Sequence, residues 1–353
     1  MGGFLTGDPA VAQIPGTDIL QVFYRGRDSA GLWTRWRDPA LTPNWSDEHP
    51  LGGVLIGDPV AAAPALAVSP VNWMSQLPDA KKLSQLTLPG THESCTAFLT
   101  EAASCQNWDL ATQLQHGIRY VDIRCRHVQN VFAIHHENIY VGFDFGEGVR
   151  DVCVDFLKAN PTECIVMQVK HEYTDADPSL TFQQVFDGYR QGFESFFYTG
   201  DHIPTLGEVR GKIVVVRRFA VDSPGTVEGL MPLTWQDNVT FGVQYTAQNG
   251  ETVKFQIQDK YNLDPDGIGA KWLALKPLLD QANADPSDAW YINFASGTAP
   301  ADFDFPNAVA GTINPQLYDY LGGAPFAARL GTLMLDFPDD NMIGRIIRLN
   351  TNK

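Results

Sequence analysis

The stretch LTLPGTHES, residues 86 to 94, places a histidine and a carboxylate directly after an apolar segment and a Pro-Gly pair. Proline presets φ and glycine tolerates positive φ, so we interpret Pro89 and Gly90 as a turn that ends a buried strand. A turn requires neither His92 nor Glu93. This polar pair therefore indicates chemistry at the end of a strand.

From residue 71 onward, segments with the pattern of strands alternate with segments of helical pattern. The expected strands span residues 82–88, 119–125, 131–136, 163–170, 212–218, 253–258, 290–294 and 332–337. Repeated βα units of this kind predict the α/β class, here an irregular (βα)8-like TIM barrel. In such barrels the catalytic residues lie at the C-terminal ends of the strands.

The ends of these predicted strands carry titratable residues. They are His92 with Glu93, Arg124, His136, Lys170, Arg218, Asp259 and Asp336. Each alone could be a turn residue, a surface partner or a helix cap, but together they favour one site. An arginine and a lysine can bind an anionic phosphate, and two histidines can serve as the acid and the base on either side of it. This combination is what the cleavage of a phosphodiester needs. Lys170 stands where a metal-dependent barrel would need carboxylates, so we expect no metal and no cofactor.

Composition excludes several classes of protein. The net charge of -16 opposes binding to nucleic acid, and apolar runs such as residues 213–216 are too short to span a bilayer. The five cysteines match no zinc pattern. Cys95 and Cys105 flank a short loop, so they could form a disulfide or remain two free thiols. The sequence does not determine whether Cys125 is paired.

The N-terminal region contains a repeat with a period of 50 residues, because GGFLTGDPAVA at 2–12 matches GGVLIGDPVAA at 52–62. Strand patterns at 19–25 and 31–37 lie between the two copies. This unit, residues 1–60, resembles one blade of a bacterial lectin-type β-propeller. A plain β-hairpin extension is the alternative. An Ala/Pro-rich linker, residues 61–70, would join it to the barrel at 71–353.

Seven motifs in order along the barrel carry a family resemblance: LPGTHES, HGIRYVDIRCR, AIHHENIY, IVMQVKHEY, GKIVVVRRF, QIQDKYN and YINFASG. They resemble the bacterial phosphatidylinositol-specific phospholipase C family, the single-domain X-type barrels. The resemblance implies a secreted, metal-independent lyase of the lipid-degrading class. Its products would be diacylglycerol and inositol 1,2-cyclic phosphate.

The resemblance also implies roles for the strand-end residues. His92, oriented by Asp336, would take the proton of the inositol 2-hydroxyl, and Arg124 would hold a phosphate oxygen. His136, supported by Glu93, would protonate the departing diacylglycerol oxygen. The inositol ring would be held by Lys170, Arg218, Asp259 and Tyr261.

This chain departs from the family pattern at two positions. Glu93 replaces the usual aspartate, and Glu137 replaces a common glycine. Contact with the membrane would come from apolar side chains on the rim, because the net charge cannot supply it. We assign this contact to Phe303 and Phe305, with Phe98 and Leu99 as second candidates.

Two other functions stay open at this point. One is a metal-dependent glycerophosphodiester phosphodiesterase or a barrel similar to sphingomyelinase D, and the other is a carbohydrate-binding lectin whose barrel is inactive. The expected partner is phosphatidylinositol in membranes. Glycans would be a second partner if the N-terminal unit belongs to a full propeller, and nucleic acid would not be a partner.

Overall fold

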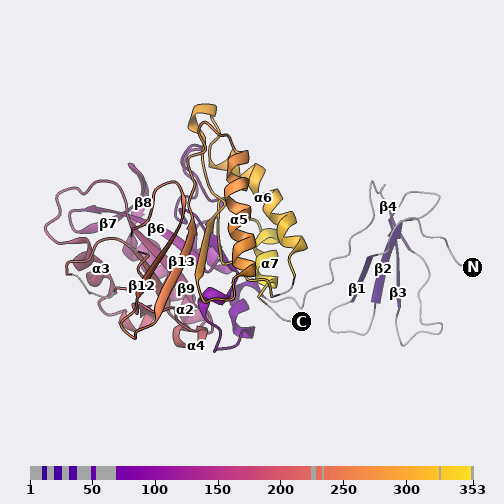
Figure 1. The fold of residues 1–353 in the computed structure, drawn as a ribbon, viewed down its shortest axis with the longest axis horizontal. Coiled ribbons are helices and arrows are strands. Elements are labelled where there is room, and N and C mark those ends of the chain that lie inside the picture. Colours follow the sequence, from indigo (N-terminus) through magenta and orange to yellow (C-terminus); the bar gives the residue numbers. More distant parts are fainter. Residues whose placement is uncertain are drawn as a thin grey trace, which may run out of the picture. The chain divides into compact units, whose positions relative to one another are not determined.

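The computed structural model describes residues 10–13, 20–25, 32–37, 49–52, 69–223, 228–232, 234–325 and 327–350 (Figure 1). The chain divides into two compact units, Met1–Ser69 and Pro70–Lys353. No helix among the described residues is both long enough and apolar enough to cross a bilayer. Each unit is described separately below.

The first unit contains a four-stranded antiparallel sheet in the order β1-β2-β3-β4. Its strands are β1 (Ala10–Gln13), β2 (Leu20–Arg25), β3 (Leu32–Arg37) and β4 (His49–Gly52). The strands expected at 19–25 and 31–37 correspond to β2 and β3. The likeness to a propeller blade stays a prediction, and residues 61–68 of the predicted linker lie outside the described residues.

The second unit is built on one sheet of eleven strands. Its parallel members, in spatial order, are β10 (Phe197–Tyr198), β11 (Ile213–Arg218), β9 (Ile165–His171), β6 (Tyr120–Val128), β5 (Leu88–Thr91), β15 (Thr332–Leu335), β14 (Trp290–Phe294) and β13 (Thr252–Gln258). β12 (Thr240–Thr246) pairs antiparallel with β13, and the hairpin of β7 (Val131–His136) and β8 (Ile139–Asp144) extends from β6. Within the described residues β10 and β12 do not pair, so the sheet stays open and the prediction of an irregular barrel is confirmed.

Helices cover the outside of this sheet. They are α1 (Leu110–Gln115), α2 (Val152–Ala159) after a π-helical turn (Gly146–Asp151), α3 (Phe182–Arg190), α4 (Leu206–Val209), α5 (Gly269–Ala284), α6 (Pro306–Gly323) and α7 (Asp340–Arg348). Short 3-10 segments span Pro70–Gln76, Leu83–Gln85, Glu194–Phe196 and Pro300–Asp302. Figure 1 shows α5, α6 and α7 along one side of the unit and α3 with the β7–β8 hairpin at the other.

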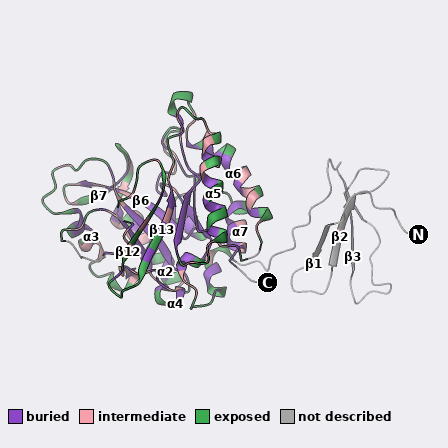
Figure 2. Cartoon of the chain, viewed as in Figure 1, coloured by how far each residue is buried: buried purple, intermediate pink, exposed green. Residues whose placement is uncertain are grey.

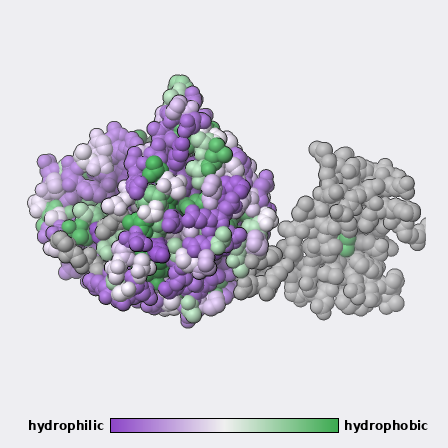
Figure 3. Space-filling view, viewed as in Figure 1, coloured by the Kyte–Doolittle hydropathy of each residue, from purple (hydrophilic) through white to green (hydrophobic). Residues whose placement is uncertain are grey.

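Apolar side chains between the helices and the sheet form the core. Leu275 of α5, Ile313 of α6 and Ile346 of α7 belong to one buried cluster with residues of β15. β9 and β11 are buried along almost their whole length, which explains their continuous apolar sequences. Figure 2 shows the buried strands inside and the exposed residues on the helices and loops. The surface in Figure 3 is mostly hydrophilic, with hydrophobic residues scattered over it.

The structure corrects the interpretation of the Pro-Gly pair, which lies inside β5 and not in a turn. Pro89 is level with Leu333 of β15, whereas pairing with β6 begins only at Gly90 and Tyr120. The missing N–H of Pro89 therefore costs little. Gly90 is required by space, because a Cβ there would lie 2.8 Å from Sδ of Met334.

The first predicted strand, residues 82–88, is also wrong over most of its length. β5 begins only at Leu88, and Leu83–Gln85 form a 3-10 turn. Leu83 and Leu86 are both buried, and a spacing of three residues suits a 3-10 turn better than the alternation of a strand. The sequence also gave no prediction of β8, β10 or β12.

Candidate active site

Three basic side chains lie in register on neighbouring parallel strands. Arg124 of β6 is paired with Lys170 of β9, and Lys170 is paired with Arg218 of β11. The strands run in the same direction, so these residues occupy the C-terminal edge of the sheet. The strand-end pattern in the sequence therefore corresponds to one row of cations.

A histidine and an aspartate meet on the other side of β6. Thr91 of β5 is level with Leu335 of β15, so the residues that follow, His92 and Asp336, lie side by side. His92 Nδ1 is 2.9 Å from Asp336 Oδ1, and only 1% of the aspartate side chain is exposed. A carboxylate at Nδ1 favours the tautomer with its proton there, which leaves Nε2 as an acceptor. Burial raises the pKa of Asp336, and the contact with His92 works in the opposite direction.

The second histidine is brought to the site by the β6–β7 hairpin. The chain turns at Gln129 and Asn130, which both have positive φ, and β7 runs back antiparallel to β6. His136, the last residue of β7, then has its Nδ1 3.0 Å from Glu93 Oε2. Glu137 follows with φ of 48°, in the left-handed region that favours glycine. Its side chain is exposed.

Glu93 connects this histidine to the row of cations. Its Oε1 lies 2.6 Å from Arg124, and its side chain is 2% exposed. Burial alone would raise the pKa of Glu93, but Arg124 and His136 bring it down to about 2. Burial would lower the pKa of His136, but the contact with Glu93 and its negative charge raise it. The pair therefore favours an ionised Glu93 and a protonated His136.

Two buried carboxylates that the sequence did not suggest also hold Arg124. Asp122 Oδ2 lies 3.1 Å from its guanidinium, and Glu172 Oε2 lies 3.8 Å away. Asp122 Oδ1 accepts a hydrogen bond from Gln168 on the neighbouring strand. Burial would lower the pKa of Arg124, but the carboxylates raise it well above its usual value. Arg124 is thus a fixed, permanently charged group.

Lys170 and Arg218 are positioned by different contacts. The ammonium group of Lys170 lies 2.7 Å from Glu172, and burial together with the charge of Arg124 lowers its pKa. The guanidinium of Arg218 lies 3.6 Å from the ring centre of Trp235. The indole N–H of Trp235 donates to Asp259 Oδ2 at 2.8 Å. Lys170, Arg218 and Trp235 line part of a cavity of about 330 Å³.

Tyr261 lies on the exposed edge of this region. The residue is 39% exposed, and its hydroxyl donates to Asp237 Oδ1 at 3.0 Å. The sequence analysis did not predict that Trp235 and Asp237 belong to the site. They lie in an irregular segment that is separated along the chain from Asp259 and Tyr261. Trp235 stands two residues before Asp237 in a segment between predicted strands, but this pattern alone does not indicate a site.

The structure separates the two phenylalanines assigned to the membrane interface. Phe303 is 78% exposed, but Phe305 is only partly exposed and caps the start of α6. Phe98, a second candidate, is 80% exposed. Phe98 and Phe303 both have positive φ, which bulky residues seldom adopt. Phe98 is thus more exposed than Phe305, which was assigned to the interface with Phe303.

The five cysteines are all free and buried, so the disulfide considered for Cys95 and Cys105 does not form. The two thiols have different surroundings. Cys95 lies near Cys153 and Asp122, whereas Cys105 lies near Asp336 and Glu93. Burial is the main cause that raises both pKa values.

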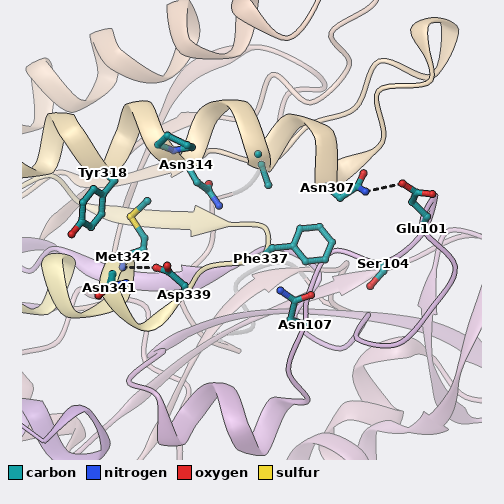
Figure 4. A pocket seen from close by; sticks show the side chains of 13 residues that line it. Glu101, Ser104, Asn107, Asn307, Asn314, Tyr318, Phe337, Asp339, Asn341 and Met342 are labelled. Atoms are coloured by element: carbon teal, nitrogen blue, oxygen red, sulfur yellow. Dashed lines mark hydrogen bonds between the residues drawn. The ribbon is translucent and has the colours of Figure 1, made fainter. Parts of the chain in front are cut away.

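A larger cavity of about 780 Å³ has Phe337, the residue after Asp336, in its lining (Figure 4). It is lined by the loop at Glu101 to Asn107, by α6 and by the start of α7. Asn307 donates to Glu101 at 2.8 Å across this space. None of its lining residues is a lysine, arginine or histidine, so the cavity does not offer the charges that an anionic phosphate needs.

Comparisons with known proteins identify relatives of this chain. Residues 91–219 match the family model described as phosphatidylinositol-specific phospholipase C, X domain. A 1-phosphatidylinositol phosphodiesterase of Staphylococcus aureus strain Newman is 32% identical over 317 residues, which cover 82% of this chain and 97% of that protein. A protein of the same name from Listeria monocytogenes is 29% identical over 299 residues, or 80% of this chain and 86% of the relative.

Solved structures give the same result. A mutant of phosphatidylinositol-specific phospholipase C from Staphylococcus aureus superposes with a TM-score of 0.72 and 32% identity, covering 81% of this chain and all of that one. The enzyme from Listeria monocytogenes gives a TM-score of 0.64 at 27% identity, covering 81% of this chain. The family resemblance seen in the sequence is confirmed: the chain belongs to the bacterial phosphatidylinositol-specific phospholipase C family.

Proposed function

We propose that the protein cleaves phosphatidylinositol by attack of the inositol 2-hydroxyl on phosphorus, which gives diacylglycerol and inositol 1,2-cyclic phosphate. The observation that carries this proposal is a pair of imidazoles, each held by its own buried carboxylate, with Arg124 fixed beside one of them. The relatives named above are phosphodiesterases of this lipid by name, which supports the same substrate.

His92 is the proposed general base. Its contact with Asp336 at 2.9 Å keeps a proton on Nδ1, so Nε2 accepts the proton of the attacking hydroxyl. The imidazolium that forms is stabilised by the carboxylate beside it. This arrangement follows the physical logic by which a buried aspartate orients a catalytic histidine.

Arg124 is the proposed binding group for the phosphate. Charge builds up on the non-bridging oxygens as the 2-hydroxyl attacks, and a prearranged cation stabilises it without reorganising. Three carboxylates hold the guanidinium in one orientation, so it does not have to be ordered again when the substrate binds. Its side chain keeps 14% of its surface exposed for a ligand.

His136 is the proposed general acid. It must be protonated before it can give a proton to the departing diacylglycerol oxygen, and Glu93 favours that form. The longer side chain of glutamate reaches His136 and Arg124 with its two oxygens at the same time. One carboxylate therefore links the proton donor to the phosphate-binding group.

The inositol ring would be recognised by Lys170, Arg218 and Asp259, with Tyr261 against its face. A polyol needs charged hydrogen-bonding partners around its rim and an apolar surface beneath it. Trp235 contacts both Arg218 and Asp259 and so holds a cation and a carboxylate at a fixed separation. A fixed pair of opposite charges supports their assignment to the hydroxyl groups of the ring. Asp237 orients Tyr261 in the same region.

We assign no metal to this reaction. Lys170 and Arg124 supply the positive charge that a divalent ion gives in metal-dependent phosphodiesterases, and they engage the carboxylates Glu93, Asp122 and Glu172. Activity should therefore persist in EDTA. Loss of cleavage in EDTA would favour the metal-dependent alternative.

The membrane is proposed to meet the rim at Phe98 and Phe303. Both rings are mostly exposed, and they follow β5 and β14 at the C-terminal side of the barrel. An exposed aromatic ring gains free energy when it leaves water for the lipid interface. The family resemblance predicts a location outside the cell. The cysteines give no support for it, because none of them forms the disulfides that are common in secreted proteins.

The direct test of the assignment is the His92→Ala variant. We expect it to lose cleavage of phosphatidylinositol by roughly 10² to 10⁴ in rate, the usual contribution of a general base. Binding of sugars by the first unit, if any, should be unchanged. Retained cleavage would remove His92 from the mechanism, and sugar binding by a protein that never cleaves the lipid would favour the lectin alternative.

A further inference from the structure

Cys105 lies beneath the catalytic pair and has no role in the proposed reaction. Ligand atoms of His92, Cys105 and Asp336 all lie within 4.8 Å of one another. The geometry points to a metal site: we propose that these three side chains bind a Zn²⁺ ion, and that the bound ion switches the enzyme off reversibly. The inhibition rests on the proposed function, but the binding does not.

The three donors are the types that zinc prefers. Thiolate, imidazole and carboxylate bind Zn²⁺ at about 2.3, 2.0 and 2.0 to 2.2 Å, and three protein ligands leave a fourth position for water. His92 and Asp336 are already 2.9 Å apart. Bringing the sulfur into the same tetrahedron needs a movement on the order of 1 Å.

Asp336 gives a second, independent indication of a ligand. Its Oδ1 contacts His92, but Oδ2 is buried and has no hydrogen-bond partner among the described residues. A buried carboxylate oxygen normally has a partner. A cation bound between the aspartate and the thiol would satisfy it.

Cys105 is held in place for this role by its backbone. Its amide donates to Thr96 Oγ1 at 3.2 Å, and its carbonyl accepts from the amide of Phe337 at 3.0 Å, next to Asp336. Its thiol reaches the carbonyl of Ala103 only at 4.0 Å, which is a weak contact. Metal binding at the sulfur would therefore replace only this contact and the interaction with the side chain of Thr96.

Binding is a simple exchange of protons for the ion. The thiol releases its proton to solvent, and the sulfur becomes a thiolate ligand. The proton on Nδ1 of His92 moves to Nε2 so that Nδ1 can bind the ion, and no electron is transferred. The ion also takes electron pairs from the imidazole and the carboxylate that form the His92–Asp336 pair. His92 can then no longer accept the proton of the 2-hydroxyl, so cleavage stops until the ion leaves.

The test uses the full chain and Co²⁺ as a spectroscopic substitute for Zn²⁺. Addition of Co²⁺ should give a thiolate-to-cobalt charge-transfer absorption in the near ultraviolet, and Zn²⁺ should displace it. Cys105→Ser and Cys105→Ala should abolish the band. Cys164→Ala is the matched control, because Cys164 is equally buried but lies at the start of β9, at the other end of the barrel, and should keep the band.

Activity provides the second measurement. After EDTA treatment, Cys105→Ala should cleave phosphatidylinositol at the wild-type rate, but half-inhibition by free Zn²⁺ should need at least about tenfold more metal. Thermal melting checks that each variant folds, and Zn²⁺ should raise the Tm of the wild type and of Cys164→Ala but not that of the Cys105 variants.

The proposal is overturned if the cobalt band is absent in the wild type or persists in both Cys105 variants. It is also overturned if Zn²⁺ inhibits Cys105→Ala as strongly as the wild type. A protein that binds cobalt through Cys105 but never cleaves the lipid would leave the metal site standing and remove the proposed function.

Discussion

Glu93 stands at a position where the family resemblance leads us to expect an aspartate. One methylene longer than aspartate, it places its two oxygens on two different partners, Arg124 at 2.6 Å and His136 at 3.0 Å. Its backbone has φ of 43°, and its amide donates to Asp122 at 3.2 Å. The glutamate is therefore held at both its backbone and its side chain, which compensates for the longer, more flexible chain.

Replacing Glu93 by glutamine should lower activity and move its pH dependence. The negative charge of Glu93 raises the pKa of His136, so His136 keeps the proton it must donate to higher pH. Without that charge the pKa falls, and the alkaline limb of the kcat/KM profile moves to lower pH. We expect a loss of roughly ten to a hundredfold near neutrality, measured on phosphatidylinositol across pH 5 to 9. A uniform loss with an unmoved alkaline limb would mean that Glu93 only supports the fold.

At the scale of elements, α5 supports the substrate-binding segment through a buried lysine. Lys271 is fully buried, and its ammonium donates to Gln258 Oε1 at 3.1 Å and to the carbonyl of Lys260 at 2.8 Å. Gln258 in turn donates to Asn293 Oδ1 at 2.9 Å. These bonds fix the chain on both sides of Asp259. Burial lowers the pKa of Lys271 to about 7.

Lys271→Met should change how the free energy of unfolding depends on pH. In the unfolded chain Lys271 keeps its proton up to about pH 10, but in the folded protein it loses it near pH 7. The unfolded state thus binds more protons between these values, and wild-type stability should rise with pH there by at most about 1.4 kcal/mol per unit relative to the variant.

Urea unfolding of both proteins between pH 6 and 9 measures this difference. Lys271→Arg is the control, because it keeps a cation that does not titrate in this range. A stability difference between wild type and Lys271→Met that stays constant with pH would show that the lysine does not lose its proton in the folded state.

The elements also show what the sequence could and could not predict. The strands expected at 131–136 and 290–294 match β7 and β14, because short, mainly apolar runs identify buried strands. The row of Arg124, Lys170 and Arg218 followed from the rule that strand ends meet at one edge. Asp122, Trp235 and Lys271 could not be predicted, because their roles depend on contacts between segments that only the fold brings together. Lys271 lies in a helical pattern in which a lysine is usually exposed.

At the scale of the whole molecule, an acidic protein is proposed to work on a lipid surface. The net charge of -16 gives no attraction to anionic lipid, and the surface seen in Figure 3 is mostly hydrophilic. Adsorption would then depend on a few exposed rings at the open end of the barrel, and Phe98 and Phe303 are the two most exposed phenylalanines of the described residues.

The double variant Phe98→Ala/Phe303→Ala should bind vesicles of phosphatidylinositol at least about tenfold more weakly, because even one ring removed from water contributes roughly 1.5 kcal/mol or more. Cleavage of a short-chain substrate dissolved as monomers should stay within about twofold of the wild type, since the catalytic groups are untouched. Equal losses on both substrates would place the two rings in the catalytic machinery instead of at the interface.

The most direct measurement of the central claim is phosphorus NMR of phosphatidylinositol vesicles incubated with the protein in EDTA. If His92 activates the 2-hydroxyl for attack on phosphorus, the five-membered cyclic phosphate must appear first, and His92→Ala must fail to produce it. Inositol 1-phosphate forming first, without any cyclic signal, would contradict the account.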